Sequence, residues 1–183
     1  MNTSAWTGIE LFVEGEEDEL FVRRILEPRL AAHYLHVGVY QYAQRSSERL
    51  EKHFRSLTRM QSTHNLTVFL LTDCEVGRCI RSVRQAIAQE YPHFLKESQV
   101  LVVRPEIEAW YCAGIPTPNP FKAEIPASVE QIDKETFAQL LGERAVNRLE
   151  RKILLAEILE RYDWQLALQR SASLRYCAGK LGI

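Results

Sequence analysis

The chain has 183 residues, of which 46% are hydrophobic and 26% charged, as is typical of a globular protein with one main core. Its 23 basic and 24 acidic side chains give a formal net charge of -1, which excludes a globally basic surface that would by itself attract nucleic acid. No apolar run approaches the roughly 20 residues needed to span a bilayer, and the N-terminus lacks a secretory signal, so we expect a cytoplasmic protein with no membrane partner.

Strands and helices are predicted to alternate along the first part of the chain. Apolar runs that end at turn residues indicate strands at 8–15, 34–42, 65–73 and 98–106. Helical spacing of apolar residues indicates helices at 16–34, 46–61, 76–91 and 106–114. Pro28 predicts a kink or an early end in the first helix. This order predicts an α/β fold with a central parallel sheet of about four strands flanked by helices.

A proline-rich segment separates this part from a helical C-terminal part. Residues 114–127 contain Pro116, Pro118, Pro120 and Pro126, which predicts a stiff extended loop. Beyond it, helical spacing continues at 133–142, 147–162 and 163–182, with no strand of useful length. We therefore expect an α/β domain at 1–113, the loop at 114–127, and a helical extension at 128–183 packed on the same domain.

Acidic residues follow three of the predicted strands. Glu14 ends the first strand, Asp73 and Glu75 follow the third, and Glu106 and Glu108 follow the fourth. Because the carboxyl ends of parallel strands meet at one edge of a sheet, we expect these side chains to converge there. Clustered carboxylates repel one another by several kcal/mol unless a cation or a proton intervenes. The pattern therefore indicates a site for a divalent cation with oxygen ligands, such as Mg²⁺.

Several of these acids have alternative interpretations. Asp18 lies four residues after Glu14, about one helical turn away, and is placed to face the same pocket. Glu75 is also suited to cap the helix that follows it. Two residues apart, Glu106 and Glu108 cannot face the same way on a helix, so we prefer Glu108 as the site residue and keep Glu106 as the alternative.

Four stretches resemble a known family. "LFVEGEEDELF" (11–21) resembles the Glu-Gly motif of Toprim domains, and "FLLTDCE" (69–75) resembles their Asp-x-Asp motif, with Glu75 where most have a second Asp. "RPEIEAWYCAG" (104–114) and "SASLRYCAGKL" (171–181) resemble, more narrowly, short and largely uncharacterised bacterial and phage-associated proteins allied to the OLD-type (overcoming lysogenization defect) nucleases. The resemblance spans nearly the whole chain.

The resemblance implies a Toprim-like fold, dependence on Mg²⁺ or Mn²⁺, and hydrolysis or nicking of DNA or RNA, with an association with phage defence. Carried over to this sequence, it makes Glu14 a metal ligand or general acid/base. It assigns a first ion to Asp73 and Glu75, and a second to Asp18 and Glu108. The chain has no G-x-x-x-x-G-K-[ST] motif, so any ATP-dependent control would come from a separate ATPase chain.

Basic and hydroxyl groups near these motifs are candidates for binding the substrate phosphates. Arg78 follows the Asp73 motif and Arg104 precedes Glu106, although both are equally suited to pair with the acids. Ser171 and Ser173 are expected to cap the last helix, and only the resemblance marks Ser173 and Arg175 as substrate contacts. In 142–161, Arg and Lys alternate with Glu, which predicts a solvated helix face.

Two other functions fit the same residues. The first is a non-catalytic Toprim-like module that binds a partner, which the longer side chain of Glu75 in place of Asp favours. The second is a small phosphatase or nucleotide hydrolase, which fits the net charge of -1 better than an enzyme acting on nucleic acid does.

Overall fold

The structure of the protein is a computed structural model that describes residues 6–43, 45–62, 64–74, 77–118, 121, 124–141 and 147–183. The chain forms two compact units, and each is described by itself. The first consists of Met1–Thr72 and Ile80–Leu101, and the second of Asp73–Cys79 and Val102–Ile183. The domain boundaries expected from the sequence stay a prediction.

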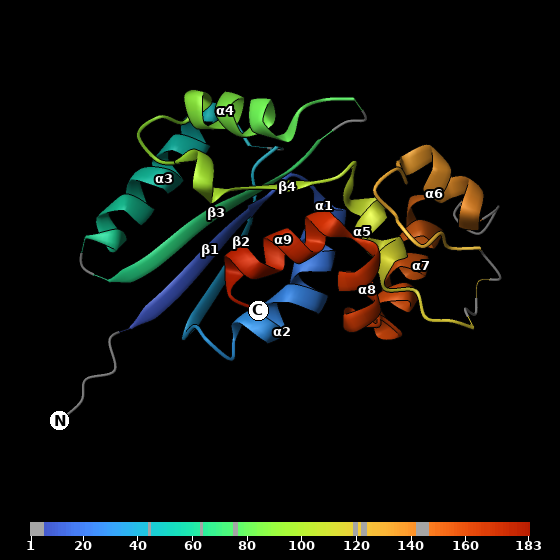
Figure 1. The fold of residues 1–183 in the computed structure, drawn as a ribbon. Helices are drawn as coiled ribbons and strands as arrows, with labels where there is room; N and C mark the ends of the chain where they lie inside the picture. The colour runs from blue at the N-terminus through green and yellow to red at the C-terminus, as the bar shows by residue number, and fades with distance from the viewer. Residues whose placement is uncertain are drawn as a thin grey trace. The chain divides into compact units, whose positions relative to one another are not determined.

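The described residues form one four-stranded parallel sheet of order β2-β1-β3-β4 (Figure 1). Its strands are β1 (Thr7–Val13), β2 (His36–Gln41), β3 (Asn65–Asp73) and β4 (Val100–Val103). In register, Leu11 of β1 lies opposite Val39 of β2 and Phe69 of β3, so β1 has a neighbour on both sides. The predicted α/β fold with a central parallel sheet is confirmed. β4 ends before Pro105, which has no N–H to donate to a ladder.

Helical segments of the first unit follow its strands as the sequence predicts, except η2 (Glu97–Gln99), which takes residues predicted to begin the fourth strand. They are α1 (Glu16–Phe21), η1 (Val22–Leu26), α2 (Glu27–Leu30), α3 (Ser47–Gln61), α4 (Ile80–Glu90) and η2 (Glu97–Gln99). The irregularity predicted at Pro28 takes the form of a π-helical segment, η1, directly before α2. Pro28 then lies in the first turn of α2, where a missing N–H is tolerated.

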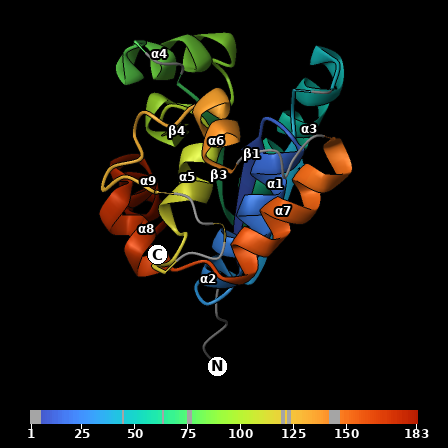
Figure 2. The ribbon, with the colours of Figure 1, turned by 90° about the vertical axis from the view of Figure 1, so that its right-hand side faces the viewer.

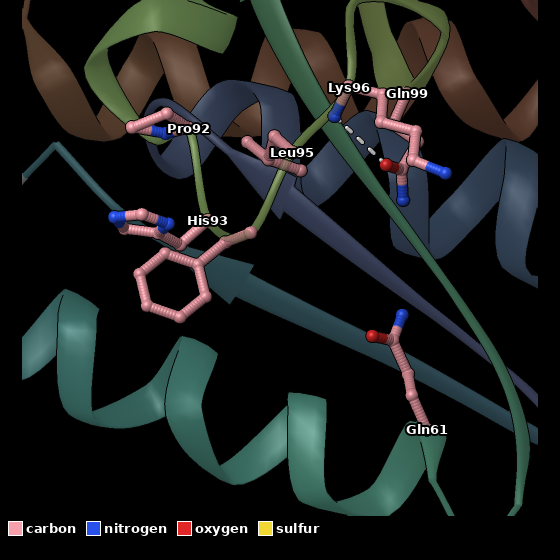
Figure 3. Close-up of a pocket in the computed structure, with 7 residues that line it drawn as sticks. Gln61, Pro92, His93, Leu95, Lys96 and Gln99 are labelled. Carbon is pink, nitrogen blue, oxygen red and sulfur yellow. Dashed lines mark hydrogen bonds between the residues drawn. The ribbon is translucent and has the colours of Figure 1, made fainter.

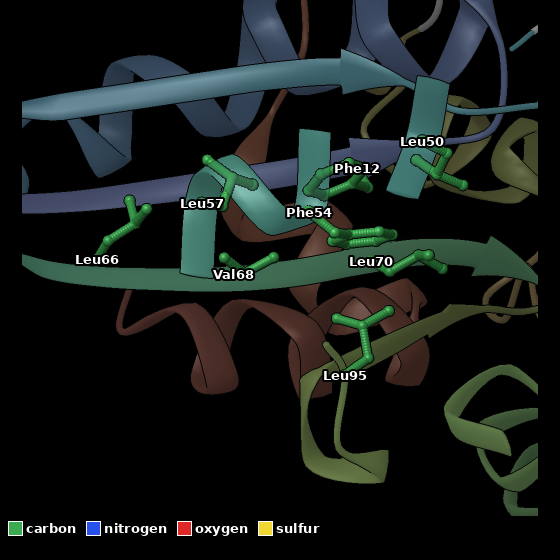
Figure 4. Packing of buried hydrophobic residues seen from close by; sticks show 8 residues of the cluster. All are labelled: Phe12, Leu50, Phe54, Leu57, Leu66, Val68, Leu70 and Leu95. Atoms are coloured by element: carbon green, nitrogen blue, oxygen red, sulfur yellow. The ribbon is translucent and has the colours of Figure 1, made fainter. Parts of the chain in front are cut away.

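One face of the sheet in the first unit packs against α3 (Figure 4). The buried cluster comprises Phe12, Leu50, Phe54, Leu57, Leu66, Val68, Leu70 and Leu95. Its members on β3 alternate along the strand, and those on α3 recur at helical spacing, so each element presents one apolar stripe to the other. The rings of Phe12 and Phe54 stack with centroids 4.5 Å apart. This packing holds α3 against the sheet.

The described helices of the second unit are α5 (Ile107–Ala113), α6 (Lys134–Leu141), α7 (Arg148–Glu160), α8 (Trp164–Arg170) and α9 (Ala172–Leu181) (Figure 2). Every residue of α5 is buried, and α5 packs against α6, α7 and α8. The run at 163–182 is divided between α8 and α9 at Ser171, whose extended backbone and hydroxyl cap α9. None of the helices in the described part of the chain has the length and apolar character needed to cross a membrane.

Candidate functional site

Glu14 and Asp18 lie at the carboxyl end of β1, in the first unit. Glu14 directly follows the strand and is exposed; within the described residues its carboxylate has no hydrogen bond or ion pair. Asp18 is 7% exposed, and its Oδ2 accepts a hydrogen bond of 2.9 Å from the backbone N–H of Gly15, the N-cap of α1. The cap therefore holds the Asp18 carboxylate at the start of the helix, next in sequence to the strand end.

Neighbouring acids of α1 have a different role. Glu19 accepts a hydrogen bond of 2.7 Å from Arg23 and another from the side-chain amide of Gln41. Because Gln41 ends β2, this contact ties α1 to the edge strand of the sheet. Glu19 thus has a structural role, and Glu14 and Asp18 are the acids of this segment that remain candidates for the site.

Asp73 ends β3 and is half-buried, whereas Glu75 lies outside the described residues. The N–H of Cys74, the next residue, donates to the carbonyls of Val103 and Pro105, both at 3.0 Å. Further on, the backbone carbonyl of Arg78, whose side chain is exposed, accepts a bond of 3.5 Å from Cys74 Sγ. The backbone hydrogen bonds of Cys74 connect the segment after Asp73 to the segment that leads from β4 toward Glu106.

Glu108, on α5, is 5% exposed and forms an ion pair with Arg151 of α7, with 2.6 Å between Oε1 and Nη2. The guanidinium of Arg151 also lies 5.4 Å from the ring centroid of Phe137. Burial, together with the negative charge of Glu108, raises the pKa of Cys112 to about 12. The solvated face predicted for this helix is wrong at Arg151, which is largely buried as the partner of Glu108. No periodicity distinguishes Arg151 from the other basic residues of α7.

Glu106, the alternative to Glu108, is the N-cap residue of α5. Its Oε2 accepts a hydrogen bond of 2.7 Å from the backbone N–H of Lys134, the first residue of α6. Both acids of the pair therefore connect α5 to another helix: Glu106 to α6 and Glu108 to α7. Arg104, two residues before Glu106, is exposed.

Two serines of the "SASLR" segment, at the start of α9, belong to a buried polar network. The indole N–H of Trp110, which is fully buried, donates to Ser173 Oγ at 3.0 Å. Glu130 Oε1 accepts from Ser171 Oγ at 3.0 Å and from the backbone N–H of Ser173 at 3.1 Å. Arg175 is exposed and donates to the carbonyl of Leu168 at 2.6 Å. No sequence pattern indicates Glu130, because its partners lie 41 and 43 residues further along the chain.

The predicted ligands for a cation are all carboxylates, which suits a hard ion such as Mg²⁺ or Mn²⁺. Among the described residues, no group of three or more His, Cys, Asp or Glu side chains is arranged to hold a metal ion. The carboxylate of Glu14 is exposed and so is accessible to a cation, whereas the buried Glu108 is already neutralised by Arg151.

The described surface also contains separate hollows. In the first unit, a hollow of ≈ 310 Å³ near the carboxyl end of β2 is lined by Tyr40, Arg49, Lys52, His53 and Ser56. Another, of ≈ 250 Å³, lies among Gln61, Pro92, His93, Phe94, Leu95, Lys96 and Gln99, where the backbone N–H of Lys96 donates to the Gln99 side chain at 3.0 Å (Figure 3). This second hollow is at the amino ends of the strands, away from the edge where parallel sheets bind ligands. In the second unit, a hollow of ≈ 470 Å³ is lined by Pro126, Ser128, Glu130, Gln131, Ile132 and Thr136.

Comparison of the chain with protein-family models, with curated proteins and with solved structures gives no match.

Proposed function

We propose that the protein is a metal-dependent enzyme that hydrolyses or nicks the phosphodiester bonds of nucleic acid at a Toprim-like acidic site. The observation that carries the proposal is the position of Glu14 and Asp18 at the carboxyl end of β1, a strand with parallel neighbours on both sides. This is the edge at which open α/β sheets bind their ligands. The resemblance to Toprim motifs at Glu14 and at Asp73 supports the same chemistry.

On this proposal, Glu14 is a metal ligand and general acid/base, and Asp73 with Glu75 holds the first cation. Mg²⁺ or Mn²⁺ supplies a more acidic water and stabilises charge on the phosphate oxygens. Asp18 is the stronger candidate for a second ion, because Glu108 would first have to leave Arg151. The chain's own contribution is to hold these carboxylates in place before the substrate binds.

A cleavage assay tests this proposal. Supercoiled plasmid, linear duplex DNA, single-stranded DNA and RNA are incubated with Mn²⁺ and wild type, Glu14→Gln, Asp73→Asn or Glu160→Gln. Glu160 is an exposed acid at the end of α7, so its substitution matches the others in charge. We expect wild type and Glu160→Gln to cleave at least one substrate, and the other two variants to lose about 100-fold or more of the rate, as loss of a metal ligand predicts. Equal cleavage by all four proteins would show a contaminant and end the proposal.

A second candidate is a non-catalytic binding module of the same fold. The ion pair of Glu108 with Arg151 favours it, because a carboxylate that already has a buried cationic partner has less need of a metal. Titration calorimetry with Mn²⁺ separates the two, since only the enzyme requires binding at millimolar concentration or below. The same preparations assayed with nucleoside triphosphates would detect a nucleotide hydrolase.

A further inference from the structure

We propose that the hollow at the carboxyl end of β2 binds a backbone phosphate of a nucleic-acid strand. Its lining residues are Tyr40, Arg49, Lys52, His53 and Ser56, and its volume is ≈ 310 Å³. All of them belong to β2 and α3, within the first unit. We call this set of residues the basic hollow.

The residues that α3 contributes form one stripe along the helix. Arg49, Lys52, His53 and Ser56 follow the i, i+3, i+4, i+7 spacing that places side chains on a single helix face. The stripe carries hydrogen-bond donors and no carboxylate. Arg and Lys side chains donate without accepting, so a ligand that fits between them must be an acceptor, and phosphate oxygens are strong acceptors.

The two cations of the basic hollow are available to a ligand. Arg49 and Lys52 are exposed, and within the described residues neither forms an ion pair. Arg55, on the same helix, differs, because its guanidinium pairs with Glu51 at 3.0 Å. The charge left uncompensated on α3 therefore includes the two residues that line the hollow.

Aromatic rings hold the floor of the basic hollow in place. The rings of Tyr40 and His53 stack with centroids 4.1 Å apart and an interplanar angle of 10°, and Phe12 meets the His53 ring edge-on at 5.4 Å. Arg45 lies over Tyr40, with its guanidinium carbon 5.8 Å from the ring centroid, and adds a further cation. Burial lowers the pKa of His53, so the positive charge of the hollow comes from Arg and Lys side chains.

The position of the hollow favours a nucleic-acid strand over a small free anion. Gln41, next to Tyr40, lies opposite Val13 in register, and the N–H of Tyr42 donates to the Val13 carbonyl at 2.9 Å. Glu14 follows Val13, so the basic hollow and Glu14 are at the same edge of the sheet. A nucleic-acid strand with one phosphate in the hollow has further phosphates that can lie near Glu14, and this step rests on the proposed function. With a net charge of -1, the chain needs such a local site to hold a polyanion.

Binding is measured by fluorescence anisotropy of a dye-labelled oligothymidine in EDTA, so that neither metal nor cleavage is required. The test variant is Arg49→Gln/Lys52→Gln, and the control is Arg55→Gln/Arg59→Gln, which removes the same charge from α3 outside the hollow. Circular dichroism and thermal melting verify that both fold. We expect the test variant to bind about tenfold more weakly or worse, with a salt slope reduced by about 0.7, because the hollow holds one phosphate and each phosphate neutralised on a single strand contributes about 0.7. The control should stay within about twofold of wild type.

Wild-type affinity in the test variant would overturn the inference, and so would an equal loss in the control, which would mean that only overall charge matters. Thymidine monophosphate and inorganic phosphate are added as competitors. Displacement of the oligothymidine by either one at the same phosphate concentration would assign the hollow to a free phosphate and overturn the strand assignment. Failure of the proposed function is distinct, because it would abolish cleavage and leave this binding in EDTA intact.

Discussion

Ser173 accepts a hydrogen bond from the indole of Trp110, a side chain with 0% exposure. Ser173→Ala removes this acceptor from the buried indole N–H. We expect the loss of the hydrogen bond to lower the free energy of unfolding by about 1–3 kcal/mol. Urea denaturation measures the loss, and Arg175→Ala, at an exposed position nearby, should change stability by no more than about 0.5 kcal/mol. Unchanged stability of Ser173→Ala together with weaker nucleic-acid binding would make Ser173 a substrate contact instead.

The burial of His53 predicts that the unfolding free energy of the protein depends on pH. Burial lowers its pKa from the ordinary value of about 6.5, although the nearby carboxylate of Glu10 opposes the shift. The unfolded chain therefore takes up the proton more readily than the folded one. The unfolding free energy keeps its full value above about pH 6.5 and decreases as the pH falls from there through the lower pKa of the folded chain.

Replacing His53 with Phe keeps a ring against Tyr40 and removes the titration. We expect the unfolding free energy of His53→Phe to decline less than that of wild type between about pH 7 and pH 5, measured by urea denaturation at each pH. His33→Gln, which replaces an exposed histidine, is the matched control variant. Parallel profiles for wild type and His53→Phe would show that His53 does not contribute to acid sensitivity.

Glycines in a strand and in a helix should respond to alanine with opposite signs. A Cβ on Gly38 of β2 would come within 2.1–2.3 Å of the Glu10 carboxylate, which is hydrogen-bonded to His36 at 2.9 Å. Gly38→Ala therefore displaces Glu10 from its partner and should cost about 1 kcal/mol. A Cβ on Gly179 of α9 meets nothing within 4 Å, so Gly179→Ala should gain about 0.5–1 kcal/mol through helix propensity.

A double-mutant cycle identifies Glu10 as the cause. In a Glu10→Ala background the obstruction is gone, and Gly38→Ala should become neutral or stabilising in urea denaturation. If the cost of Gly38→Ala is the same in both backgrounds, it comes from the backbone of β2 and the steric argument fails.

Helices and strands followed the sequence wherever one periodicity ran without interruption. The continuous apolar run of β3 and the helical spacing of α3 are local patterns, and both elements form where the sequence predicts them. Helical spacing of apolar residues runs through 163–182, and the break between α8 and α9 comes from a single extended residue, Ser171, which caps the last helix as the sequence predicts. A one-residue break changes the direction of the chain without interrupting the apolar spacing of the sequence.

Contacts between distant segments were beyond the sequence. Arg151 and Glu108 are 43 residues apart, and only packing of α7 on α5 selects Arg151 from among the similar basic residues of that helix. The positions of Glu14 and Asp73 at strand ends were predictable because a strand end is a local feature. How ionised groups are neutralised depends on tertiary structure, and so do the partners of Glu108 and Glu106.

Cation binding should be visible in the stability of the whole protein. A ligand that binds only the folded chain stabilises it by RT ln(1 + [L]/Kd), about 2.7 kcal/mol at a concentration 100 times Kd. The proposed function makes both Glu14 and Asp73 ligands, so saturating Mn²⁺ should raise the melting temperature of wild type and of Glu160→Gln. Glu14→Gln and Asp73→Asn should each lose most of that shift. If Mn²⁺ raised the melting temperature of Glu14→Gln as much as that of wild type, but not that of Asp73→Asn, the ion would not need Glu14. The catalytic role proposed for Glu14 would then have to be withdrawn.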